Sequence, residues 1–402
     1  MPVPPRFQRR SSALSAQPAG AERWKAAARG LLAIVGGASL AAAMASDRVE
    51  LQTIDHRLVT GRVVREARDG SLLIEHDDGR YELLGPVDIA LRSSVTGPPV
   101  RERPIEFGRR VLAELPAGFD LLVTKHYVVC FDTTREYAKW CAALFERLHD
   151  AFGNYWSRAG VEVTDPEQPL VVVIFADRRA YETHAAADLG AAADRVVGYY
   201  NLLSNRITTF DLTGSDQLAA ERGRHPGRVG LEILSHPAAA GLVSTLVHEA
   251  SHQLAFNNGM HRRLAPVPLW VSEGVATYFE TPDLGHVRAW RAVGAVNRPR
   301  LDRFLETYRP GCVEAVVRGD DAFRDPDRAV DAYATAWAVC HHLLKVRKSA
   351  FVNYLRELAV KQPLDEDSPE TRLDEFRAAF GDPAAVEEAV MKAMARLASG
   401  PR

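Results

Sequence analysis

The segment His248-Glu249-Ala250-Ser251-His252 sets the strictest condition on how this chain can fold. Its two histidines are four positions apart, so on an α-helix their side chains lie on one face, a turn apart. Two imidazoles at that spacing can bind one metal ion, with Glu249 beside them. Apolar residues on both sides and a stop signal at Asn258-Gly259 favour a buried helix. The alternative is a helix whose histidines belong only to the core or the surface.

Residues 269–280, Leu-Trp-Val-Ser-Glu-Gly-Val-Ala-Thr-Tyr-Phe-Glu, contain a candidate third ligand. Pro268 and Pro282 border the segment, which suits a helix of about three turns. Such a helix can direct the Glu273 carboxylate at a metal ion held by the two histidines. Two imidazoles and one carboxylate leave a fourth tetrahedral position for water, as in catalytic rather than structural zinc sites.

These segments resemble the gluzincin metallopeptidases, which include thermolysin and aminopeptidase N. The phrase Trp270-x-x-Glu273-Gly274-x-Ala276 after the histidine motif is similar to the aminopeptidase N side of that superfamily. The longer phrase of residues 272–280 is still more similar to a family of uncharacterised bacterial secreted proteins with a predicted gluzincin domain. The resemblance covers residues 105–398, and its specific motifs lie between residues 248 and 280.

The resemblance implies a zinc-dependent peptidase with an α+β, zincin-like catalytic domain. Zn²⁺ would be held by His248, His252 and Glu273, and would activate a water and polarise a substrate carbonyl. Glu249 would take the proton of that water and deliver it to the leaving amine. Tyr333 resembles the tyrosine that stabilises the oxyanion in aminopeptidase-type members.

Several alternatives stay open at this site. Tyr333 is otherwise a core tyrosine, and His341 and His342 are competing donors to the oxyanion. Thermolysin-like enzymes orient a zinc histidine with an acidic residue one turn after the metal glutamate, where this chain has Thr277. Thr277, a backbone carbonyl or Glu280 would have to supply that contact. The Gly-x-Met-x-Asn phrase of aminopeptidase N does not precede the motif, which argues against an aminopeptidase.

Two other functions compete with a peptidase. One is an inactive zinc-binding protein that uses the peptidase fold for recognition, and the other is a zinc hydrolase of a non-peptide bond. A net charge of −2 gives no electrostatic case for binding nucleic acid or an anionic membrane. The resemblance implies a peptide or protein substrate as the partner.

Residues 1–45 have the pattern of an export signal peptide. Basic residues precede the apolar run from Leu31 to Ala43, and Ala43-Met44-Ala45 fits the cleavage rule. The run is too short to span a bilayer comfortably, so we expect a periplasmic or extracellular protein without a stable membrane anchor. The alternative is an alanine-rich leader.

Residues 46–95 alternate in polarity like short strands separated by turns at Asp69-Gly70 and Asp78-Gly79. They predict a small antiparallel module, barrel-like and of the SH3-like kind, with an unknown partner or with no ligand of its own. Residues 96–104, with three prolines, are the predicted linker.

Residues 105–400 are the predicted catalytic domain, with a mixed sheet followed by C-terminal helices. The apolar segment 170–175 favours a central strand covered on both faces. The resemblance implies that residues 206–212 form the rim strand beside the site, where an extended peptide would pair, and the alternative is an ordinary sheet edge. Residues 283–328 are expected to be irregular or weakly helical.

The four cysteines contain no Cys-x-x-Cys pair, so a thiolate metal site is not expected. In an exported protein, Cys130–Cys141 or Cys312–Cys340 would form disulfides, whereas buried thiols fit the sequence equally well.

Overall fold

A computed structural model describes residues 48–95, 102–214, 239–281 and 290–400. An antiparallel sheet comes first and is followed by a mixed sheet and then by helices, so the α+β prediction is confirmed at this level. The predicted signal peptide and most of the predicted linker lie outside the described residues. Among the described helices, none has the length and apolar character that crossing a membrane requires.

The N-terminal sheet has five antiparallel strands in the order β4-β3-β2-β1-β5. Its strands are β1 (Arg48–Thr53), β2 (Leu58–Glu66), β3 (Leu72–His76), β4 (Tyr81–Leu84) and β5 (Ile89–Ser94). The predicted turns hold Gly70 and Gly79 at φ 84° and 79°, a conformation that glycine adopts without a steric penalty. Alternate residues along the strands form a small hydrophobic cluster, separate from the main core, of Val49, Leu51, Val59, Leu72, Ile74 and Leu84.

The second sheet is mixed and has the order β6-β7-β8-β10-β9. Its strands are β6 (Asp120–Val123), β7 (Tyr127–Phe131), β8 (Leu170–Phe175), β9 (Gly198–Asn201) and β10 (Arg206–Phe210). The apolar strand β8 is fully buried between β7 and β10, parallel to both, as its sequence predicts. The helices around this sheet are α2 (Pro104–Ala113), α3 (Arg135–Ala159) and α4 (Arg178–Leu189).

The prediction that residues 206–212 form the rim strand is wrong. Residues 206–210 form β10, which is paired on one side with β8 and on the other with β9, and β9 is the edge strand. Strands β9 and β10 form an antiparallel hairpin. The strand order differs from the prediction because β10 pairs in parallel with β8. This pairing is long-range, and the local sequence pattern of a hairpin does not encode it.

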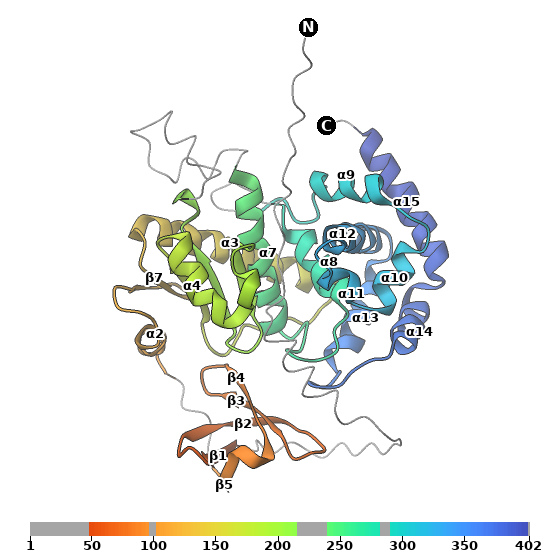
Figure 1. The fold of residues 1–402 in the computed structure, drawn as a ribbon. Helices are drawn as coiled ribbons and strands as arrows, with labels where there is room; N and C mark the ends of the chain where they lie inside the picture. Colours follow the sequence, from red (N-terminus) through yellow and green to blue (C-terminus); the bar gives the residue numbers. More distant parts are fainter. Residues whose placement is uncertain (1–47, 96–101, 215–238, 282–289, 401–402) are drawn as a thin grey trace, which may run out of the picture.

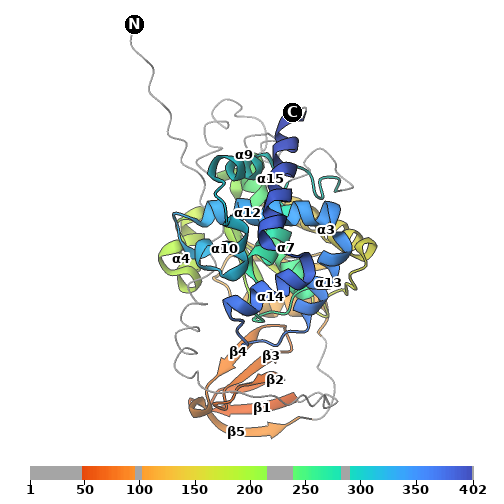
Figure 2. The ribbon, with the colours of Figure 1, turned by 90° about the vertical axis from the view of Figure 1, so that its right-hand side faces the viewer.

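Helices make up the remainder of the chain, and α7 lies centrally between the sheet and the C-terminal helices (Figures 1 and 2). They are α7 (Ala240–Asn257), α8 (Leu269–Phe279), α9 (Arg298–Thr307), α10 (Cys312–Arg318), α11 (Asp321–Arg324), α12 (Ala329–Val346), α13 (Lys348–Ala359), α14 (Pro369–Phe380) and α15 (Pro383–Ser399). Residues 283–328, expected to be irregular or weakly helical, contain the short helices α9, α10 and α11 in their described part. Their apolar faces are narrow, as in α9, where Leu301 and Phe304 are buried among charged neighbours, so periodicity is weak.

All four cysteines are free thiols, and Cys130, Cys141 and Cys340 are buried. The buried-thiol alternative is therefore the one found for these three. Cys340 lies in α12 against α8, where its Sγ and the Ala336 carbonyl oxygen face Gly274.

We expect Gly274→Ala to destabilise the fold. A Cβ at this position would lie 2.1 Å from Cys340 Sγ and 3.0 Å from Ala336 O, so the two helices would have to separate. Such overpacking costs about 1–3 kcal/mol, which exceeds the ~0.5–1 kcal/mol that alanine gains over glycine in a helix. Denaturant unfolding measures the change. Gly153→Ala in α3 is the control, because no atom lies within 4 Å of its added Cβ; equal stabilities of the two variants would contradict the packing argument.

The N-terminal sheet is attached to the turn of the β9–β10 hairpin (Figure 1). The Tyr81 amide donates to the Leu203 carbonyl at 2.8 Å. Arg263, only 4% exposed, donates to the carbonyls of Gly79 and Leu202 at 2.6 and 3.2 Å, and its guanidinium lies 3.7 Å from the centre of the Tyr81 ring. The N-terminal sheet therefore contacts the hairpin both directly and through a buried arginine.

Candidate metal centre

His248, His252 and Glu273 meet at one buried point between α7 and α8. His248 Nε2 lies 3.0 Å from Glu273 Oε2, His252 Nε2 lies 3.2 Å from the same oxygen, and the two nitrogens are 3.1 Å apart. The three residues are between 1% and 9% exposed. The structure therefore brings together the three side chains that the sequence predicts as ligands, and this buried group can hold a metal ion.

The donor set fits a tetrahedral ion. Atoms about 2.0–2.1 Å from such an ion are about 3.3–3.4 Å apart, close to the edges of the triangle found here. If both imidazole nitrogens donate to the Glu273 oxygen, hydrogen bonding leaves the contact of 3.1 Å between the two nitrogens unexplained, whereas a shared metal ion accounts for all three distances. Imidazole and carboxylate ligands together suit a first-row transition metal such as zinc.

Glu280 orients His248 from the other side of its ring. Its Oε2 lies 3.0 Å from His248 Nδ1, so it fixes the tautomer that leaves Nε2 facing the triangle. Arg300 donates to both Glu280 oxygens at 3.2 and 3.1 Å, and Asn297 donates to Oε1 at 3.1 Å. Thr277, another candidate for this contact, instead donates to the carbonyls of Glu273 and Gly274.

The charges of this cluster favour a bound cation. Burial alone would raise the pKa of Glu280 and Glu273, but Arg300 and His248 lower the first to about 2, and His252 and His248 lower the second to about 2. Burial would likewise lower the pKa of His248, and hydrogen bonds to Glu273 and Glu280 raise it to about 10. The carboxylates therefore hold a proton on His248, and a metal cation that displaces it keeps their charges compensated.

We expect Glu280→Gln to weaken metal binding at this centre by about 10–100-fold, the usual effect of losing the partner that orients a ligand histidine. The amide keeps the shape of the side chain, but it removes the charge that faces His248 and leaves Arg300 without its carboxylate. Competition against a chromophoric zinc chelator measures the affinity. Glu366→Gln, on an exposed residue, is the control; equal affinities in the two variants would refute the orienting role.

Glu249 lies beside the triangle and is 3% exposed. Its Oε2 accepts a hydrogen bond from the Tyr200 amide of strand β9 at 2.8 Å, and its Oε1 has no partner within the described part of the chain. Burial raises the pKa of Glu249, so this carboxylate takes up a proton more readily than an exposed glutamate. One oxygen is thus held by the edge strand and the other is available for proton transfer.

Helix α7 is tied to the sheet by polar side chains on its C-terminal half. Gln253 donates to the Val171 carbonyl of β8 and to the carbonyl of Asn205, the residue before β10, both at 3.1 Å. Asn257 donates to Asn205 Oδ1 at 2.7 Å and to the Tyr200 hydroxyl at 3.3 Å. These contacts hold α7, which carries two of the candidate ligands, against the β9–β10 hairpin, whose Tyr200 amide donates to Glu249.

Tyr333 of α12 lies close to the centre. It is 2% exposed, and its ring centre is 6.1 Å from that of His248 and 5.4 Å from the Arg300 guanidinium. The competing His341 packs against Trp337 and Tyr278, with ring centres 5.1 and 6.0 Å away, and lies about two turns further along α12 than Tyr333. Of these candidates, Tyr333 is the one whose ring contacts a ligand histidine.

Three contributors to the centre were missed by the sequence reasoning, namely Arg300, Asn297 and the Tyr200 backbone amide. The first two lie in a segment whose sequence predicts irregular or weakly helical structure, and a backbone donor has no residue signature. The capping pattern Asn297-Arg298-Pro299 is a local signal that could have predicted a helix there.

A family model described as "Protein of unknown function (DUF1570)" matches residues 242–365. The matched segment contains both halves of the metal centre, Glu280, Arg300 and Tyr333. No curated protein matches the chain.

Proposed function

We propose that this chain is a zinc-dependent peptidase of the gluzincin type. The observation that carries the proposal is the buried triangle of His248, His252 and Glu273, with Glu249 one residue after the first ligand and one of its oxygens free. The same arrangement motivates a zincin-like assignment for the second sheet and its helices. An SH3-like assignment for residues 48–95 and export of the protein belong to the same proposal.

The proposed roles follow from the contacts. His248, His252 and Glu273 would hold Zn²⁺, which when bound lowers the pKa of a water and polarises a carbonyl. Glu249 takes the proton of the attacking water at Oε1, while the Tyr200 amide keeps Oε2 in place. It then delivers the proton to the leaving amine. Tyr333, beside His248, is the proposed donor to the oxyanion.

Charge balance supports a divalent ion. Three buried carboxylates, Glu249, Glu273 and Glu280, surround the centre, and Arg300 compensates one of them. A dication bound by neutral imidazoles compensates the other two. A buried cluster with no net charge avoids most of the cost of desolvating ions.

The proposed substrate is an extended peptide paired with the edge strand β9. Tyr200 and Gly198 alternate with the residues bonded to β10, so their backbone groups face away from the sheet. Because the Tyr200 amide already donates to Glu249, the peptide would use the Tyr200 carbonyl and the Gly198 backbone. This places the peptide backbone next to the general base.

The test is removal and restoration of the metal. The purified chain should cleave a denatured protein and members of a broad peptide library, lose that activity in a strong chelator, and regain it with added Zn²⁺. Activity that survives complete metal removal would refute the mechanism. A zinc-loaded chain that cleaves no peptide would instead favour the inactive binding protein or a hydrolase of another bond.

A further inference from the structure

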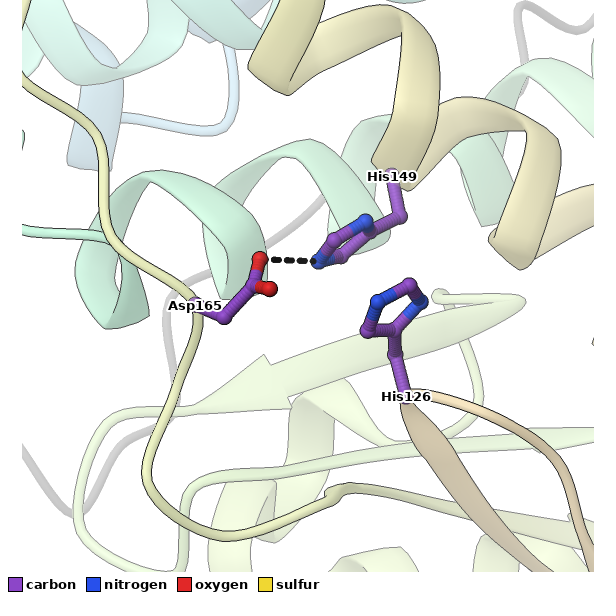
Figure 3. Close-up of side chains that lie close together, drawn as sticks. All are labelled: His126, His149 and Asp165. Atoms are coloured by element: carbon purple, nitrogen blue, oxygen red, sulfur yellow. Dashed lines mark ion pairs between the residues drawn. The ribbon is translucent and has the colours of Figure 1, made fainter.

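A second cluster of metal-binding side chains lies outside this centre. His126 directly precedes β7, His149 lies on α3, and Asp165 lies in the connection from α3 to β8 (Figure 3). One potential ligand atom from each residue lies within 4.8 Å of the other two. Among the described residues, this cluster and the candidate metal centre are the two groups with that property.

The carboxylate of Glu146 positions the His126 ring in a way that suits a metal ligand. Its Nδ1 lies 2.6 Å from Glu146 Oε2, and Glu146 Oε1 accepts from the His126 amide at 2.8 Å and from the Thr124 hydroxyl at 2.6 Å. This carboxylate fixes the proton on Nδ1 and leaves a lone pair on Nε2. A metal-bound histidine usually has such a partner on its other nitrogen.

The lone pair on His126 Nε2 accepts no hydrogen bond from the described residues. The side chain is 9% exposed, and its buried Nε2 has no hydrogen-bond partner in the described ranges. A buried acceptor without a partner is unfavourable, and such atoms are rare unless a water or an ion satisfies them.

His149 and Asp165 provide the other ligands. The His149 ring stacks on that of His126 with centres 3.7 Å apart and planes 16° apart, and its Nε2 lies 3.6 Å from Asp165 Oδ1. Figure 3 shows one nitrogen of each imidazole on the side of the stack where the Asp165 carboxylate lies.

We propose that His126, His149 and Asp165 form a second site for a divalent transition metal of the zinc class. Two imidazoles and one carboxylate favour such an ion over Ca²⁺ or Mg²⁺, which prefer oxygen ligands. The nearly parallel rings do not yet direct both lone pairs at one point, so binding includes a rotation of the His149 ring. Asp165, whose side chain is 72% exposed, closes the site from the solvent side and leaves an entry path.

Such an ion would join three parts of the fold. It connects the start of β7, the middle of α3 and the α3–β8 connection. In that connection the Thr164 amide donates to the carbonyl of Asn258, the residue that follows α7, at 3.0 Å. The expected role is therefore structural, and it does not depend on peptidase activity.

The test is a zinc titration of the full chain by competition against a chromophoric chelator. We expect two bound Zn²⁺ in the wild type, one in His149→Gln and one in Asp165→Asn, because the affinity of this site falls about tenfold or more. Asp150→Asn is the matched control, since that exposed carboxylate is 3.9 Å from His149 Nδ1 and is not a ligand. Glu273→Ala should lose the other ion and keep this one.

A second measurement separates this site from the proposed peptidase centre. Zn²⁺ should raise the melting temperature of Glu273→Ala but not that of Glu273→Ala combined with Asp165→Asn. Equal zinc content in the wild type, His149→Gln and Asp165→Asn would overturn the proposal. If Zn²⁺ binds only at this site, the proposed peptidase fails while the second site stands.

Discussion

Glu249→Gln is expected to lower the rate of peptide hydrolysis by a factor of about 10²–10⁴, the usual contribution of a general base. The amide keeps the size of the side chain and its carbonyl oxygen still accepts from the Tyr200 amide, so the local structure persists. It cannot take a proton from the attacking water. The kinetic parameters kcat and KM of the zinc-loaded variant measure the effect.

Zinc content is the necessary second readout for this variant. Glu249 is not one of the three converging ligands, so the variant should bind as much Zn²⁺ as the wild type. Glu366→Gln, on an exposed residue, should keep wild-type activity. Wild-type turnover in Glu249→Gln would remove this residue from the chemistry.

Glu273→Ala should nearly abolish metal binding at the same centre. The substitution removes a ligand and the negative charge that both imidazoles face, so the loss of affinity should exceed the roughly 10–100-fold expected when only the orienting partner of His248 is lost. The measurement is best made in an Asp165→Asn background, where the second proposed site does not contribute. Zinc content equal to that of the background would exclude Glu273 as a ligand.

The sequence predicts the parts of this site that depend on local spacing. The His248–His252 pair and the Glu273 helix each have a periodic pattern and clear end signals, and the structure brings the three side chains together. The central strand β8 follows in the same way from an uninterrupted apolar segment. The order of the strands beyond β8 does not follow from the local sequence, because β10 pairs with β8 across a long stretch of chain.

The surroundings of the site depend on tertiary contacts with no local signature. Glu280 was one of three candidates to orient His248, and only the structure distinguishes it from Thr277. Arg300 comes from a helix whose narrow apolar face gave a weak periodic signal. The Tyr200 amide is a backbone group, so nothing in its residue type indicates that it holds Glu249.

The attachment of the N-terminal sheet connects that sheet mechanically to Glu249. Arg263 and Tyr81 donate hydrogen bonds to the carbonyls of Leu202 and Leu203 in the hairpin turn. Strand β9, which leads into that turn, donates to Glu249 through the Tyr200 amide. A molecule that pulls the sheet away must break these bonds or shift the strand with it. If the proposed peptidase activity is found, its rate should therefore change when a partner binds the N-terminal sheet, although that sheet contributes no ligand to the candidate metal centre.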